Sequence, residues 1–135
     1  MIERKRGKKG DEMSNETVTM YRPTGPDELE LVKQSNYRRW PPRLPEQPIF
    51  YPVTNEEYAR EIAVKWNVPS CGVGYVTCFK VLKEFVDRYE THQVGAKRHT
   101  EWWIPAEDLE DLNDNIIGTI EVIGIFKKDD ESAKG

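Results

Sequence analysis

The sequence predicts an α+β fold with a small mixed, mostly antiparallel sheet, continuous or split, and three to four short helices. Segments that alternate apolar and polar residues are interleaved with segments of helical periodicity. Their order lacks the regular rhythm of a parallel βαβ sheet. The length of 135 residues is that of one domain. We place this domain at 17–126, after a flexible basic lead at 1–16 and before a polar tail at 127–135.

The first strand and the first helix follow from alternation and from proline. Residues 17–22 (TVTMYR) alternate as a strand does, and the turn residues of 23–26 end the strand. Pro26 suits the first position of a helix, and the two acidic residues behind it lie at the helix's positive end. The apolar spacing that follows predicts a short helix to about Gln34.

The next stretch is the most distinctive part of the chain. Four prolines within 36–48 make this segment stiff and extended, and 49–51 (IFY) is a short strand. Thr54 and Glu57 match a capping box that opens an amphipathic helix. We expect this helix to end before Pro69, because the residue preceding a proline is pushed out of the helical region.

The second half of the chain continues the mixture of strands and helices. The expected strands are 75–81, 91–94, 99–104 and 119–126, and the expected helices are 82–89 and 105–118. In the last helix Ile116 completes an apolar stripe and Gly118 ends the helix. Gly124 marks a bulge in the final strand.

The charge distribution bears on nucleic-acid binding. The formal net charge is −4, but the first ten residues carry +4, which leaves −8 for the rest. An acidic body argues against nucleic-acid binding by the fold, so nucleic acid is an unlikely partner except at the basic lead. Met13 is an alternative start, in which case 1–12 is an upstream extension.

The sequence favours a cytoplasmic protein that does not contact membranes. Two cysteines, Cys71 and Cys78, do not make a disulfide scaffold, and no apolar run has the length of a signal or membrane-spanning segment. The same cysteines with His92 and His99 lack the spacing of a zinc finger, so no metal site is expected. The spacing of Arg39-x-x-Pro-x-x-Pro resembles a ligand for an aromatic groove, but it runs into an apolar strand and is expected to be folded.

Two charged residues are candidates for a site. Glu101 lies in a strand beside two tryptophans, where a carboxylate can be desolvated and poised to hold a ribose hydroxyl or stabilise a cation. Arg22 ends the first strand and is the matching cation. The simpler interpretations are an exposed strand carboxylate and a structural salt bridge.

Four segments resemble a family of small uncharacterised bacterial proteins that are often labelled "ADP-ribosylation/crystallin". These segments are MYRPTGPDELELV, PPRLPEQPIFYPVTNEEYAREIAVKWN, GYVTCFKV and EWWIPAEDLEDLNDNIIG. The resemblance covers roughly 17–123, and its proline-rich stretch is the most specific piece. The crystallin-related ADP-ribosylglycohydrolases are much larger and all-helical, so this chain is not expected to be one.

The order of these residues is also similar to ADP-ribosyltransferase-like domains. This likeness implies that Arg22, Tyr51 and Thr54 bind NAD and that Glu101 is catalytic. Position 99 is histidine where protein-modifying members keep Glu or Gln. The first hypothesis is therefore an ADP-ribosyltransferase-like domain that binds NAD or a related nucleotide.

The alternative is a non-catalytic protein-interaction or regulatory module. Trp40, Trp102, Trp103 and Arg43 would form its surface, since aromatic and arginine side chains are typical interface anchors. Neither hypothesis identifies a substrate, a partner or an oligomeric state.

Overall fold

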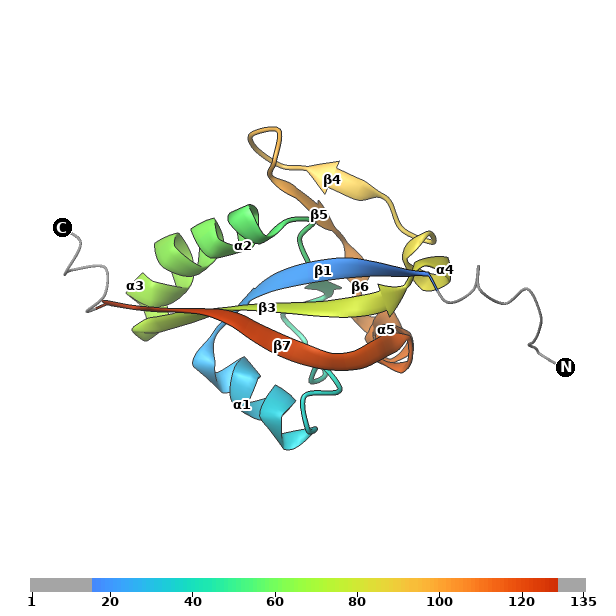
Figure 1. Cartoon of the computed structure of the whole chain (residues 1–135), viewed down its shortest axis with the longest axis horizontal. Helices are drawn as coiled ribbons and strands as arrows, with labels where there is room; N and C mark the ends of the chain where they lie inside the picture. The colour runs from blue at the N-terminus through green and yellow to red at the C-terminus, as the bar shows by residue number, and fades with distance from the viewer. Residues whose placement is uncertain (1–15, 129–135) are drawn as a thin grey trace, which may run out of the picture.

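The computed structural model describes residues 16–128 and confirms an α+β architecture with antiparallel sheets (Figure 1). Its main sheet has three antiparallel strands in the order β1–β3–β7. These are β1 (Thr17–Thr24), β3 (Val73–Leu82) and β7 (Ile116–Lys127). The lead at 1–15 and the tail at 129–135 lie outside the described residues, and Lys127, predicted to begin the tail, belongs to β7.

Two short ladders and two isolated bridges extend the main sheet. β2 (Ile49–Phe50) pairs with β6 (Ile104–Pro105), and β4 (Thr91–Gln93) pairs with β5 (Thr100–Trp102). Val53 bridges to Tyr21 of β1 on one side and to Glu101 of β5 on the other. The sheet is therefore split, and Val53 joins its two parts.

Short helices lie on both sides of the main sheet. They are α1 (Pro26–Gln34), α2 (Glu56–Ile62), the π-helix η2 (Ala63–Asn67), α3 (Val68–Cys71), α4 (Lys83–Val86), the 3-10 helix η3 (Ala106–Asp108) and α5 (Leu109–Asp114). In Figure 1, α2 and α3 are drawn above the three strands and α1 below them. Within 16–128, no helix has the length and hydrophobicity needed to cross a membrane.

Each face of the main sheet supports its own apolar cluster. Met20 and Phe79 are direct cross-strand partners and pack on one face with Trp40 in the larger cluster. Val76 lies on the other face, in a second cluster with Tyr58 of α2. Because successive residues of a strand point to opposite faces, neighbours in β1 belong to different clusters.

The start of α2 differs from the predicted capping box. Asn55 is the N-cap, and its side-chain oxygen accepts the Tyr58 N–H at 2.7 Å. Thr54 is instead tied to β5, since its backbone N–H donates to the Thr100 carbonyl at 3.1 Å and the two hydroxyls are hydrogen-bonded. The prediction of Thr54 as N-cap is wrong because this pairing holds Thr54 one residue outside the helix.

The predicted end of this helix before Pro69 is also wrong. The chain passes through η2, in which the Val68 N–H reaches the Ala63 carbonyl, and continues as α3 to Gly72, whose φ is 83°. Pro69 lies in the first turn of α3, where a backbone donor is not needed. The wider π-helical turn thus allows the proline to follow without a break.

The last helix and the strands beside it have other bounds than predicted. The helix predicted for 105–118 ends at Asp114, and Ile116 and Gly118 belong to β7. Gly118 has a φ of 83° and lies in a stretch where the register of β3 and β7 shifts. A second shift falls between Val122 and Gly124, which confirms the predicted bulge. In β1 the strand continues through Pro23 to Thr24.

Candidate functional site

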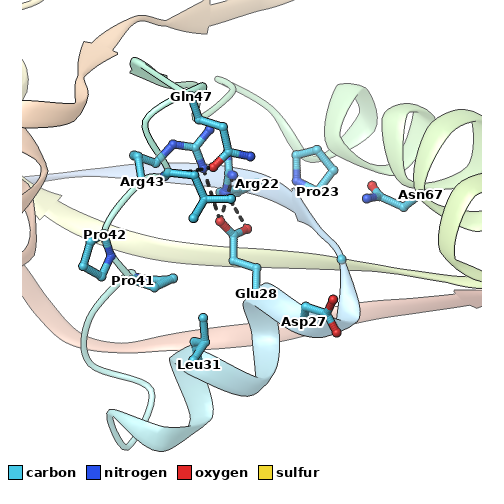
Figure 2. A pocket seen from close by; sticks show the side chains of 12 residues that line it. Arg22, Pro23, Asp27, Glu28, Leu31, Pro41, Pro42, Arg43, Gln47 and Asn67 are labelled. Atoms are coloured by element: carbon cyan, nitrogen blue, oxygen red, sulfur yellow. Dashed lines mark hydrogen bonds and ion pairs between the residues drawn. The ribbon is translucent and has the colours of Figure 1, made fainter.

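A cavity of about 350 Å³ lies where the end of β1 meets α1 and the proline-rich loop (Figure 2). We call it the arginine cleft. Among its lining residues are Arg22, Gly25, Glu28, Pro42, Arg43 and Asn67. The cleft therefore combines a strand end, a helix start, a stiff loop and the π-helix.

Hydrogen bonds hold the proline-rich loop at two positions, Tyr37 and Trp40, before it reaches the arginine cleft. After α1 the chain turns through Asn36 and Tyr37, whose φ values of 64° and 61° are left-handed. The Tyr37 carbonyl accepts the Ile120 N–H of β7 at 2.7 Å. The buried Asn113 side chain then accepts the Trp40 N–H at 2.8 Å and donates to the Trp40 carbonyl at 3.0 Å. These bonds hold the segment that presents Arg43.

Two arginines share one carboxylate in the arginine cleft. Glu28 accepts Nε and Nη2 of Arg22, both at 3.0 Å, in a bidentate pair. Arg43 Nη1 reaches the same carboxylate at 3.5 Å, as the dashed lines of Figure 2 show. The side chains of Arg22, Arg43 and Glu28 are only 12, 10 and 20% exposed. In this three-residue network two positive charges face one negative charge, and the exposed Asp27 at the start of α1 adds a second carboxylate to the lining of the cleft.

Burial and the second guanidinium both act on Arg43. Desolvation, and then repulsion by Arg22, lower the pKa of Arg43. The guanidinium carbon of Arg22 lies 4.4 Å from the centre of the Phe50 ring, and that of Arg43 lies 5.6 Å from it. These cation–π contacts hold both guanidinium groups against Phe50, at the edge of the hydrophobic core.

Some polar atoms beside the arginine cleft have no partner. Nε of Arg43 and Oδ1 of Asn67 are buried and form no hydrogen bond with any residue of 16–128. The N-cap of α1 is Gly25, which has no side chain to cap the first turn of this nine-residue helix. Buried polar groups are normally paired, and a helix start attracts anions. Beside the cleft, one side-chain donor (Nε of Arg43) and one side-chain acceptor (Oδ1 of Asn67) are therefore unpaired among the described residues.

The predicted NAD-binding residues lie in different surroundings. The backbone of Tyr51 contacts the arginine cleft, because its carbonyl accepts Nη1 of Arg22 at 3.4 Å. Tyr51 itself is 42% exposed. Thr54 lies farther on, bonded to Thr100 of β5. The structure thus brings Tyr51 to Arg22 but directs Thr54 to the other part of the sheet.

Glu101 projects from the face opposite to Arg22. Tyr21, Val53 and Glu101 are aligned by the two bridges, and directly paired residues share a face of a sheet. That face carries α2, because Tyr21 packs against the cluster of Tyr58 and the Tyr58 hydroxyl donates to Glu101 at 3.3 Å. Arg22 follows Tyr21 in β1 and therefore points to the other face. The structure does not bring Arg22 and Glu101 into one site.

Glu101 belongs to a second group of polar and aromatic side chains. Trp103 Nε1 donates to Glu101 at 2.8 Å, and the Trp103 ring stacks on His92 with 3.8 Å between ring centres. Tyr58 stacks on His99 at 4.6 Å. We call these five residues of α2, β4, β5 and the chain beside β5 the hairpin cluster.

The predicted interaction surface does not form. Trp40 and Trp102 are 1% and 7% exposed and belong to the larger core, and Arg43 is buried in the arginine cleft. Only Trp103 of the predicted set is exposed, at 42%. The prediction is wrong for Trp40 because Asn113 ties the loop over the core, and for Trp102 because β5 directs this side chain into the same core.

The cysteines and histidines lie apart. Cys71 and Cys78 are free thiols in α3 and β3. Within 16–128, no three His, Cys, Asp or Glu side chains gather in a way that could hold a metal ion.

Comparison with known proteins gave no relative. No family model, curated protein or solved structure matches this chain.

The sequence did not identify the residues that complete the arginine cleft. The sequence indicates only that Glu28 is a favourable charge at a helix start and that Arg43 belongs to a predicted surface. A periodic pattern cannot show that these two side chains, 15 residues apart, meet at Arg22.

Proposed function

We propose that this chain is a binding domain for a small anionic ligand of the nucleotide class, which includes NAD, and that the arginine cleft holds its phosphate. The observation that carries this proposal is the pair of nearly buried arginines, Arg22 and Arg43, that share the single carboxylate of Glu28 beside an open cavity. The two arginines carry one more charge than their shared carboxylate, and Asp27, which also lines the cleft, is exposed and screened by solvent, so an anion is favoured next to Arg22 and Arg43.

The chemistry of the cleft favours phosphate. Guanidinium groups offer a planar fork of donors that matches phosphate oxygens, and the uncapped start of α1 adds a positive helix end. The volume of about 350 Å³ is near the lower end of the range of small-molecule sites, about 300–1,000 Å³. We therefore expect the cleft to take one nucleotide or one half of a dinucleotide. In this proposal the exposed ring of Tyr51 stacks on the base.

The proposal is limited to binding. An ADP-ribosyltransferase-like reaction would need the carboxylate of Glu101 at the ribose of the same ligand, but Glu101 projects from the opposite face. An ADP-ribosyltransferase-like fold thus rests on the sequence resemblance, and a fold does not by itself establish an activity. Free Cys71 and Cys78 fit the cytoplasmic location that we propose.

Ligand-dependent stabilisation tests the proposal. We expect NAD, ADP-ribose or AMP to raise the melting temperature of the protein with increasing concentration, because a ligand that binds only the folded state stabilises it by mass action. Arg43→Gln should abolish this increase. Arg39→Gln is the matched control, since Arg39 comes from the same loop but pairs with Glu110 and Asp114 outside the cleft.

Two results would contradict the proposal. The first is the absence of any stabilisation by nucleotides or by inorganic phosphate at millimolar concentration. The second is an equal loss of stabilisation in Arg39→Gln and Arg43→Gln, which would place the binding site outside the arginine cleft.

A further inference from the structure

Glu101 has no basic partner within residues 16–128, in contrast to two other partly buried glutamates, Glu28 of the arginine cleft and Glu61 of α2. Glu28 faces Arg22 and Arg43, and Glu61 accepts from Lys65, Arg98 and His99. Glu101 is held only by neutral donors, the hydroxyl of Tyr58 and the indole N–H of Trp103. Its negative charge is therefore oriented but not compensated by the described part of the chain.

The two hydrogen bonds leave Glu101 able to accept more. Tyr58 donates to Oε1 at 3.3 Å, and Trp103 donates to Oε2 at 2.8 Å, so each oxygen has one partner. A carboxylate has about four acceptor positions, two on each oxygen. One position therefore remains on each oxygen of Glu101, as a bidentate donor requires.

Aromatic rings stand on both sides of this carboxylate. His92 is the cross-strand partner of Glu101, and its ring stacks on Trp103 with an angle of 9° between the ring planes. His99 and Tyr58 form the other stacked pair, with an angle of 22°. Alternation along the strand places residues 99, 101 and 103 on one face of the hairpin. The aromatic pairs and the carboxylate therefore border one surface.

His99 does not supply the missing positive charge. Its Nδ1 accepts the Ala96 N–H at 3.0 Å, which assigns the ring proton to Nε2, 3.2 Å from the Glu61 carboxylate. A histidine with one accepting nitrogen is neutral. The hairpin cluster thus combines aromatic rings with a carboxylate that has no arginine or lysine partner among the described residues.

We propose that Glu101, Tyr58 and Trp103 bind a guanidinium group, carried either by a small molecule or by an arginine side chain of a polypeptide. A guanidinium offers two parallel N–H donors to the two free positions of Glu101 and stacks on aromatic faces, whereas an ammonium group is a point charge without this fork. The site lies on the face opposite to the arginine cleft, so this inference does not depend on the proposed function.

A matched pair of cations tests the proposal on the full-length protein. In ¹H–¹⁵N correlation spectra, we expect methylguanidinium to shift the indole N–H signal of Trp103 and methylammonium to leave it in place. The dissociation constant should rise at least about tenfold in Glu101→Gln, which keeps the shape of the side chain and removes a charge-assisted hydrogen-bond acceptor. Glu84→Gln, at an exposed carboxylate of α4, should bind as the parent protein does.

Two further experiments identify the source of the guanidinium group and control for a folding defect. A blocked tripeptide with a central arginine that binds more tightly than methylguanidinium would support a polypeptide, and the reverse would support a small molecule. Trp103→Phe lacks the indole signal and is followed through the backbone N–H of Glu101. This variant keeps an aromatic ring next to His92, removes the donor to Glu101, and should bind more weakly than the parent even if Glu101→Gln does not fold. Equal shifts with both cations, or no shift with any guanidinium compound, would overturn the proposal.

Discussion

Replacing Glu28 by glutamine should destabilise the domain strongly, because it leaves Arg22 and Arg43 facing each other without their shared carboxylate. The three side chains are at most 20% exposed, so solvent screens the network only partly. Removing one partner of a buried ion pair costs about 3–5 kcal/mol. Glutamine keeps one acceptor oxygen and the cleft is open, so we expect about 3 kcal/mol, or roughly 10 °C in melting temperature for a domain of this size.

Thermal unfolding followed by circular dichroism measures this effect. Glu30→Gln in the same helix is the control, since Glu30 is exposed and bonded only to Gln34 among the described residues. If the two variants agree within about 0.5 kcal/mol, our account of the arginine cleft is refuted. Phosphate adds a second readout, because an oxyanion that replaces the carboxylate should stabilise Glu28→Gln more than the parent. Equal effects of phosphate would contradict anion binding while leaving the ion-pair argument intact.

Three further substitutions test other parts of the structure. Asn113→Ala should cost about 2–4 kcal/mol in urea unfolding, since it leaves the backbone N–H and carbonyl of Trp40 without partners. Gly74→Ala should cost about 1–3 kcal/mol, because a Cβ there would lie 2.7 Å from the Ala63 carbonyl of η2. Hydrogen bonds, first from Lys65 and then from His99, lower the pKa of Glu61 from 4.5 to about 2. Its stabilising contribution is therefore present above about pH 4.5 and lost as the pH falls through about 2, and acid unfolding of Glu61→Gln should lack this component.

Each of these predictions has a control. Asn115→Ala removes one exposed bond to the Asp111 carbonyl and should have a small effect. Gly25→Ala adds a Cβ 3.7 Å from Asn67 Nδ2, an ordinary contact, and should cost only the difference between glycine and alanine at the N-cap of α1, about 1 kcal/mol. Glu57→Gln, at a carboxylate that is 76% exposed, should leave the acid limb of the unfolding curve unchanged. A control that matches its test variant would show that the stated contact is not the cause.

Elements with local signals could be predicted from the amino-acid sequence alone. Proline at the first position predicted the start of α1. Alternation identified β1, β3 and β7, although the observed strands extend beyond the predicted ends by up to about three residues. The sequence also identified Arg22 and Glu101 as charged residues in strands. These properties depend on a residue and its near neighbours, so they can be read along the chain.

Which of these residues meet depends on the three-dimensional packing of the chain. The bridges through Val53 align Glu101 with Tyr21 and so place it across the sheet from Arg22, whereas Glu28 and Arg43 reach Arg22 from a helix and a loop. Trp40 was expected at the surface and is in the core. Alternation tells which residues of a strand share a face, but not what covers that face. That depends on long-range pairing and packing, which no local pattern specifies.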